Sequence, residues 1–383
     1  MKSQEHQLRM GVIGFGAAGR HHCRTIAAEV PEMRLTAVVE SDPDAAGRAA
    51  AEFGVPTFAT HAELIRAGLC DAVSVATPHV AHAAVAVDCL KGGLHVLCEK
   101  PLADTAGEAA RMVATAARSR RTLGVVFQRR FETAVQKAVQ IVREGRLGRI
   151  QRTSLVFTDF RTQSYFDCNT WRGTWIGEGG GVLLNQAPHS LDIFARLAGL
   201  PERVLGRIRT RLHRIEVEDE AEAMLTYRNG ATGRIFVSTT EPYREQIEII
   251  GEKGALVLSG TRLEIFDYGV SLRVFCRKSR DPWGRPRAAV ETFEGRESAG
   301  HGAVMRDFAR HIMFKEPHVG EAVSAVWSLE LANAITLSHW LGREVTVPVD
   351  HRLYRKKLEE TRKSSSLRRV RSVNRATDPR MRA

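Results

Sequence analysis

Residues 177–192, GEGGGVLLNQAPHSLD, combine a glycine cluster with polar side chains of types that take part in proton transfer. Four glycines fall within five positions, and an apolar run then carries Asn185, His189 and Asp192. Spacings of four and three residues place these side chains on one face if the segment is helical. From spacing alone, a core histidine with satisfied hydrogen bonds explains His189 better than half of a reaction site does.

A second candidate site is the motif GFGAAG at residues 14–19, which follows an apolar strand at residues 10–13. Its first glycine permits a tight turn and its second lets the backbone approach a pyrophosphate. The third lets the next helix pack closely on the strand, with its N-terminus directed at the phosphates. The motif predicts a dinucleotide-binding loop formed by Gly14, Phe15, Gly16, Ala17, Ala18 and Gly19.

The second strand, LTAVVE, ends at Glu40, 21 residues after Gly19. An acidic residue at about this position binds the adenosine ribose hydroxyls of a dinucleotide. The Glu40 carboxylate would also repel a 2′-phosphate, whereas the neighbouring Ser41 could accept one. The sequence therefore favours NAD over NADP as the cofactor.

The alternation of strands and helices continues to about residue 125. Segments 71–78, 95–103 and 122–131 have the pattern of buried strands, and segment 79–93 that of an Ala-rich helix. Repeated β–α units predict a doubly wound parallel Rossmann sheet in residues 1–125. Ligands of such sheets bind at the carboxyl ends of the strands. The side chains expected there are Thr77, Pro78, Glu99, Lys100 and Gln128.

Residues 126–348 have a different pattern, in which a helix at 132–145 precedes long alternating strands. An Asn-Gly pair at 229–230 and a turn at 252–254 predict two hairpins. We expect an α+β domain with an open, mainly antiparallel sheet, one face of which packs on helices. The other face would join a second subunit in a homodimer or homotetramer. Further strands are expected at 261–268 and 271–278, and late helices at about 302–314 and 319–341.

Composition and charge indicate a globular body with a basic C-terminal segment. With 383 residues, 43% of them hydrophobic, the chain is expected to fold as two globular domains. The net charge of +12 belongs mostly to residues 351–383, which hold 12 Lys and Arg against 3 Asp and Glu. We expect residues 349–383 to form a flexible basic tail. A basic arm can bind nucleic acid, but no interleaved aromatic residues support that function.

The six cysteines show no close pairs, which argues against a zinc cage and fits a reducing cytoplasm. The polar start MKSQEHQL and the absence of a long apolar run argue against a secretory signal and a membrane span. His21, His22 and His79 have no ligand-like partners in the sequence, so we expect no metal site.

The segments GVIGFGAAGRHH, HVLCEKPLA and WRGTWIGEGGGVLLNQAPHSLDIF together resemble the glucose–fructose oxidoreductase/inositol dehydrogenase/rhizopine catabolism family. The resemblance extends over about residues 8–348. It implies NAD(P)-dependent oxidation or reduction of a sugar, aminosugar or cyclitol, in dimers or tetramers. It also implies that Lys100 and His189 are the catalytic lysine and histidine. The nicotinamide side would be lined by Thr77, Pro78, His82, Glu99 and Lys100, and covered by Trp171 and Arg172.

Asn185 departs from the family pattern, because many polyol dehydrogenases of the family carry Asp at this position. A lysine acts as a base when burial or neighbouring cations lower its pKa. An Asp at position 185 would oppose that decrease, whereas Asn185 does not. We expect Lys100 and His189 to share proton transfer while Asn185 orients a substrate hydroxyl.

Two other functions fit the same residues. One is NAD-assisted glycoside cleavage, in which transient oxidation enables elimination and the cofactor is recycled internally. The other is a dinucleotide-sensing regulator that uses the basic tail to bind a partner. Retention of both Lys100 and His189 argues against the regulator.

Overall fold

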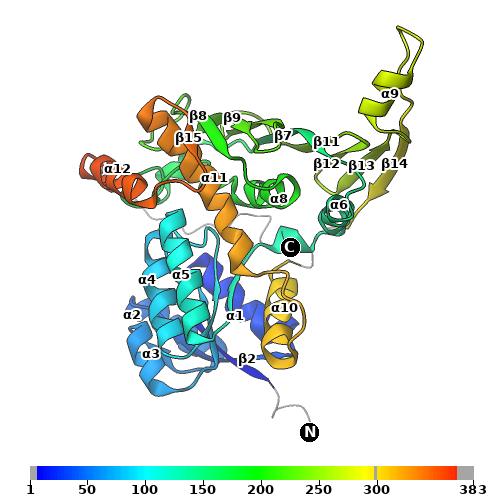
Figure 1. Cartoon of the computed structure of the whole chain (residues 1–383). Helices are drawn as coiled ribbons and strands as arrows, with labels where there is room; N and C mark the ends of the chain where they lie inside the picture. Colours follow the sequence, from blue (N-terminus) through cyan, green and yellow to red (C-terminus); the bar gives the residue numbers. More distant parts are fainter. Residues whose placement is uncertain (1–6, 297–299, 369–383) are drawn as a thin grey trace.

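The computed structural model describes residues 7–296 and 300–368, and their strands form two sheets (Figure 1). The first sheet is parallel, in the order β3-β2-β1-β4-β5-β6. Its strands are β1 (Leu8–Ile13), β2 (Met33–Val39), β3 (Thr57–Phe58), β4 (Ala72–Val75), β5 (His95–Cys98) and β6 (Leu123–Val125). The connecting helices are α1 (Ala17–Glu29), α2 (Pro43–Phe53), α3 (His61–Ala67), α4 (His79–Lys91) and α5 (Ala106–Ser119). This is the predicted Rossmann architecture.

Local sequence explains these elements. Every residue of β4 is buried, as expected for a central parallel strand covered on both faces. Helix α2 begins after Asp42, whose side chain accepts hydrogen bonds from the amides of Asp44 and Ala45. Helix α3 begins with a capping box formed by Thr60 and Glu63.

The second sheet has the order β14-β13-β12-β11-β7-β10-β9-β8-β15. Only the pairing of β7 with β10 is parallel among its described strands, so the predicted mainly antiparallel sheet is confirmed. The chain reaches it through η1 (Gln128–Phe131) and α6 (Thr133–Arg143). The strands are β7 (Ile150–Thr158), β8 (Arg203–Arg209), β9 (Glu220–Thr226), β10 (Thr232–Ser238), β11 (Arg244–Gly251), β12 (Gly254–Ser259), β13 (Arg262–Asp267), β14 (Ala289–Glu294) and β15 (Val345–Thr346).

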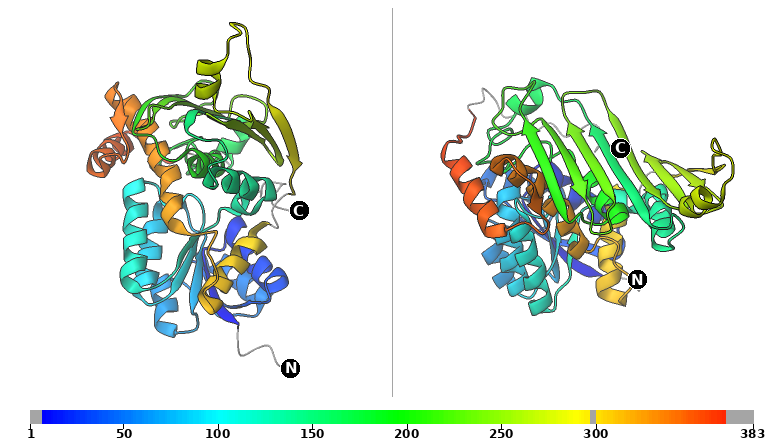
Figure 2. Two further views of the ribbon diagram at one scale, coloured as in Figure 1. Left: turned by 45° about the vertical axis from the view of Figure 1, so that its right-hand side comes forward. Right: turned by 45° about the horizontal axis from the view of Figure 1, so that its top comes forward.

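Helices cover one face of this sheet, as Figure 2 shows. Helix α6 packs on β12, α8 (Pro188–Ala198) on β7 and β11, and α11 (Ala322–Leu341) on β8. The opposite face presents exposed Leu205 and Met224. Both predicted hairpins are present, β9–β10 and β11–β12. In the described part of the chain, we find no helix with the length and apolar character needed to cross a bilayer.

Helix α10 (Gly300–Phe314) belongs to the first domain, although the predicted boundary placed it in the second. Its side chains Val304, Met305 and Phe308 are buried in one cluster with Met10 and Val12 of β1. The helix packs against α1. The sequence boundary was wrong here because the chain returns to the Rossmann domain after completing most of the second sheet.

The strand predicted at residues 271–278 is the helix α9 (Leu272–Lys278). The Ser271 side chain caps it by accepting a hydrogen bond from the Val274 amide. None of its seven described residues is buried, so no sheet environment selects the extended conformation. The helix lies at the tip of an arm beyond β13 and β14 (Figure 1).

The prediction of a flexible tail over residues 349–383 is wrong for its first half. Helix α12 (His351–Lys363) buries Tyr354 and Leu358, a pair spaced four residues apart that packs toward α5 and α11. Asp350 caps the helix by accepting hydrogen bonds from the amides of Arg352 and Leu353. Residues 369–383 lie outside the described part.

Candidate active site

The glycine loop between β1 and α1 fits a dinucleotide pyrophosphate. A Cβ at Gly19 would lie 1.8 Å from the Gly14 carbonyl oxygen, so this position requires glycine for helix–strand packing. A Cβ at Gly16 would meet no described atom within 4 Å, which leaves open space beside the loop. Among the described residues, the N-terminus of α1 has neither a side-chain cap nor an acidic residue in its first turn. Its amides are therefore available to an anion.

Glu40, which the sequence predicts to bind the adenosine ribose, lies beside this loop. Its Oε2 accepts a hydrogen bond of 2.8 Å from the Phe15 amide, and its Oε1 one of 3.0 Å from the Asp42 amide. The hydroxyl of the exposed Ser41 donates to the same Oε1 at 3.4 Å. The Glu40 carboxylate is thus held beside the glycine loop by two backbone amides.

The residues predicted to line the nicotinamide side lie where β4 and β5 end. Thr77 follows β4, and its buried Oγ1 has no hydrogen-bond partner among the described residues. Pro78 is the N-cap residue of α4. His82 is completely buried, and its ring nitrogens lie 2.9 Å and 2.8 Å from the carbonyl oxygens of Pro101 and Thr77. Both ring nitrogens of His82 are thus directed at backbone carbonyls, and its contact with the cofactor stays a prediction.

Lys100 is half-buried at the carboxyl end of β5, and its Nζ donates a hydrogen bond of 3.1 Å to the Asn185 carbonyl oxygen. Burial lowers the pKa of Lys100 below its usual 10.5, while the carboxylates of Glu99 and Glu178 oppose that decrease. The hydrogen bond joins the predicted base of the first domain to the glycine-rich segment of the second.

Glu178 is a site residue that the sequence analysis missed. It is almost completely buried, and burial raises its pKa to about 7. Its Oε2 accepts a hydrogen bond of 2.8 Å from the Gly173 amide, and its Oε1 accepts one from the Asn185 side-chain amide. The sequence did offer one signal for this residue, because Glu178 is the single acidic side chain within the glycine cluster at residues 177–181.

The expected helical face of Asn185, His189 and Asp192 is wrong in part. Helix α8 starts at Pro188, so Asn185 lies in the turns before it. Pro188 suits the first helical position, because no intrahelical hydrogen bond needs a backbone N–H there. Asp192 faces Arg130, which binds it through two hydrogen bonds.

His189 does reach the site from α8. Burial lowers its pKa well below the usual 6.5, and the nearby Lys100 lowers it further. Its ring packs against Phe127 with centroids 5.4 Å apart. Its Nδ1 is buried and has no partner among the described residues. A neutral imidazole with one free nitrogen can exchange a hydrogen bond with a ligand hydroxyl.

Trp171 contacts the first domain, whereas Arg172 is held within the second. The Trp171 ring lies 5.8 Å from the His79 ring at the start of α4, a contact that sequence reasoning missed. The Arg172 guanidinium lies 4.2 Å from the centre of the Tyr165 ring, and its buried Nε has no partner among the described residues. Helix α7 (Gln163–Asp167) carries Tyr165. Gln128 starts η1 directly beyond β6.

Glu99 is positioned by two histidines. Burial alone would raise its pKa, but hydrogen bonds from His22 and His301 hold that pKa well below its usual value. Its Oε2 accepts a hydrogen bond of 3.0 Å from the Lys100 amide. His301 was not singled out from sequence, because nothing in the sequence indicated that α10 returns to the first domain.

Sequence comparisons agree with this architecture. The profile described as "Oxidoreductase family, NAD-binding Rossmann fold" matches residues 8–127, and "GFO/IDH/MocA C-terminal domain" matches residues 135–257. Inositol 2-dehydrogenase 2 of Saccharopolyspora erythraea is 31% identical over 259 residues, which cover 66% of this chain and 73% of that protein. The chain belongs to the GFO/IDH/MocA oxidoreductase family, and its first domain is an NAD-binding Rossmann fold.

Other relatives match over different lengths. Inositol 2-dehydrogenase of Rubrobacter xylanophilus is 35% identical over 149 residues, covering 39% of this chain and 43% of that protein. The chain thus spans about half the length of several curated relatives. The structure of the WlbA dehydrogenase from Bordetella pertussis, in complex with NADH and UDP-GlcNAcA, is 28% identical with a TM-score of 0.75. The match covers 90% of this chain and 100% of the WlbA chain.

Proposed function

We propose that the protein is an NAD-dependent oxidoreductase that transfers a hydride between a secondary hydroxyl of a sugar, aminosugar or cyclitol and nicotinamide. One observation carries this proposal. The half-buried Lys100, with its lowered pKa, lies at the carboxyl edge of the dinucleotide-binding sheet and contacts Asn185 of the second domain. Ligands of open α/β sheets bind at this edge.

The cofactor, when bound, supplies the hydride acceptor or donor. The amides at the start of α1 would hold its pyrophosphate, and Glu40 its adenosine ribose. The Trp171–His79 contact would help to exclude water from the nicotinamide side.

Proton transfer is assigned to this chain's own residues. Neutral Lys100 Nζ would accept the proton of the substrate hydroxyl as the hydride leaves its carbon. The free His189 Nδ1 would hydrogen-bond the same substrate. Because the Glu178 pKa is about 7, the charge near Lys100 changes in the neutral range. The Asn185 side chain is bound to Glu178, which supports a positioning role in place of the substrate contact expected from sequence.

The substrate class is narrowed by the arginine over the site. The unpartnered Arg172 Nε favours a substrate with an anionic group near the reacting ring. The WlbA structure contains UDP-GlcNAcA, and curated relatives include levoglucosan dehydrogenase of Pseudarthrobacter phenanthrenivorans. A substrate panel should therefore compare uronic acids, which carry an anionic group, with neutral sugars, aminosugars and inositols.

The test begins with denaturation of the purified protein and mass analysis of the released nucleotide. The protein is then mixed with NAD and each panel compound, and NADH absorbance is followed. NAD binding together with substrate-dependent NADH formation supports the proposal. Glycoside cleavage without net NADH would favour the internally recycling reaction, and absence of nucleotide binding would contradict the proposal.

We also infer a homo-oligomer joined through the outer face of the second sheet, because Leu205 and Met224 are exposed there. Light scattering of wild-type protein and the variant Met224→Lys would test this. All six cysteines lie in the described part of the chain and are unpaired, which supports a reducing location such as the cytoplasm.

A further inference from the structure

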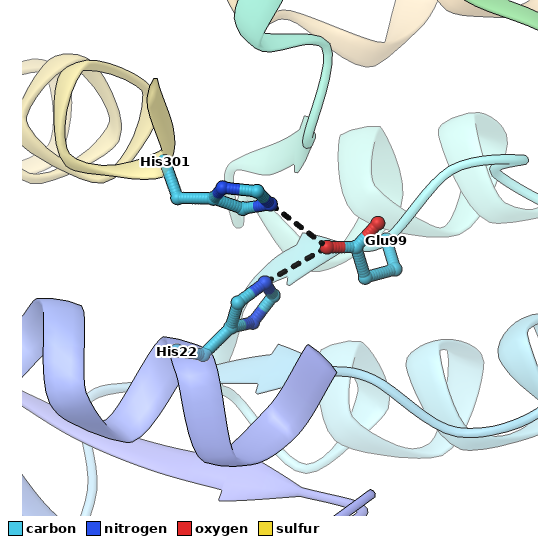
Figure 3. A group of neighbouring side chains, drawn as sticks. All are labelled: His22, Glu99 and His301. Atoms are coloured by element: carbon cyan, nitrogen blue, oxygen red, sulfur yellow. Dashed lines mark hydrogen bonds and ion pairs between the residues drawn. The ribbon is translucent and has the colours of Figure 1, made fainter. Parts of the chain in front are cut away.

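Three side chains from distant parts of the chain converge beside the proposed proton-transfer residues (Figure 3). His22 comes from α1, Glu99 from the end of β5, and His301 from α10. The Nε2 of His22 lies 2.8 Å from Glu99 Oε1, and the Nε2 of His301 lies 3.5 Å from the same oxygen. All three ligand atoms lie within 4.8 Å of one another.

Each histidine ring is held from its far side. His22 Nδ1 lies 2.8 Å from Ser74 Oγ, and His301 Nδ1 lies 3.2 Å from His21 Nε2. Metal-binding histidines characteristically use their second nitrogen in this way, because the outer hydrogen bond fixes both the tautomer and the ring orientation. Both Nε2 atoms are therefore directed inward by contacts outside the cluster.

The cluster is also shielded from solvent. The His22 side chain is fully buried, and those of His301 and Glu99 are only 10% and 13% exposed. A surface group of this composition would be explained by solvation alone, whereas buried polar groups need defined partners. Little bulk water would therefore compete with these three side chains for a bound ion.

We propose that His22, Glu99 and His301 form a binding site for a divalent transition metal, with Zn²⁺ as the best match. Two imidazoles and one carboxylate are an established zinc donor set that leaves a fourth position for water. Magnesium and calcium are poor matches, because they prefer oxygen ligands.

Two of the three separations suit tetrahedral coordination after small shifts, and the third, between the two histidine nitrogens, is at most 4.8 Å. Bonds of roughly 2.0–2.1 Å imply ligand atoms about 3.3 Å apart. The separation of 3.5 Å between His301 and Glu99 already fits. The shorter contact between His22 and Glu99 must open by roughly half an ångström, as expected when a metal replaces a hydrogen bond.

Metal binding would affect the reaction because Glu99 adjoins Lys100. The cation would occupy Glu99 Oε1, while Oε2 keeps its hydrogen bond to the Lys100 amide. This consequence rests on the proposed function, whereas metal binding itself does not.

The test measures metal uptake by the full chain without nucleotide or substrate. Chelator-treated wild type, His301→Gln and His339→Gln are dialysed against Zn²⁺, and bound metal is determined by elemental analysis. His339 is an exposed histidine of α11 and serves as the matched control. We expect one equivalent in wild type and His339→Gln, and at least tenfold weaker binding in His301→Gln. No uptake by wild type, or equal affinity in His301→Gln, would overturn the site.

A second measurement covers the case in which His301→Gln fails to fold. Co²⁺ added to wild type should give the visible spectrum of a tetrahedral nitrogen and oxygen site. A thiolate charge-transfer band would show binding at a cysteine such as the exposed Cys276 and would overturn the proposal. Because metal uptake is measured without added NAD or substrate, failure of metal binding is distinguishable from failure of the oxidoreductase assay.

Discussion

The cofactor loop and the proton-transfer site differ in how far apart their parts lie along the chain. The loop at residues 14–19 is a single turn between β1 and α1, and Glu40 ends the next strand. The proton-transfer site joins Lys100 to Glu178 and His189 from the second domain, and helix α12 contacts the segment that carries Glu178. The predicted cofactor loop is thus formed by local geometry, whereas the proposed proton-transfer site is formed by tertiary assembly.

The largest effect is expected at the base itself. Lys100→Met removes the proton acceptor and should lower turnover by about 10²–10⁴-fold, the range for general acid–base groups. NAD binding should persist, because the glycine loop and Glu40 are unchanged. Steady-state rates and nucleotide titration check both statements. The exposed Lys91→Met at the end of α4 is the control, and a comparable loss there would remove the special role of Lys100.

Two glycine substitutions separate folding from cofactor binding within the loop. Gly16→Ala places a methyl group in open space, so the melting temperature should stay unchanged while NAD affinity falls at least tenfold. Gly19→Ala places Cβ against the Gly14 carbonyl and should lower the melting temperature as well. Thermal melts and NAD titrations measure the pair. Full NAD affinity in Gly16→Ala would show that phosphates do not use this space.

A smaller effect is expected where α12 contacts the active-site segment. Arg362 donates hydrogen bonds to the Trp175 carbonyl oxygen at 3.1 Å and to Asp104 at 2.9 Å. Because Arg362 keeps some exposure, Arg362→Ala should cost about 1 kcal/mol of unfolding free energy and raise KM more than it lowers kcat. The exposed Arg352→Ala on the same helix is the matched control. Identical KM and melting temperature in both variants would mean that α12 does not support the site.

Sequence predicts local features well, because their constraints lie within one or two neighbouring elements. The strand–Gly–helix motif, the acidic residue after β2 and, in the second domain, both Gly-containing hairpin turns required no long-range information. The same reasoning placed Lys100 correctly at a strand end.

The remaining features depend on contacts that sequence periodicity does not encode. Glu178 lies in the site because the turns before α8 bring it within hydrogen-bond distance of the Asn185 side chain. Burial there raises the Glu178 pKa. His301 joins His22 only because α10 returns to the first domain. The α12 helix has just two buried residues, so its apolar stripe was too weak to distinguish it from a disordered tail.

The pH dependence of kcat/KM for alcohol oxidation, in wild type and Glu178→Gln, tests most directly whether Lys100 is a base controlled by Glu178. Oxidation requires neutral Lys100, so the rate should rise as pH increases through its pKa. In wild type, Glu178 ionises near pH 7 and its negative charge raises the Lys100 pKa. Glu178→Gln removes that charge, so the rise should move to lower pH by on the order of one unit. A rise at the same pH in both proteins would contradict this coupling.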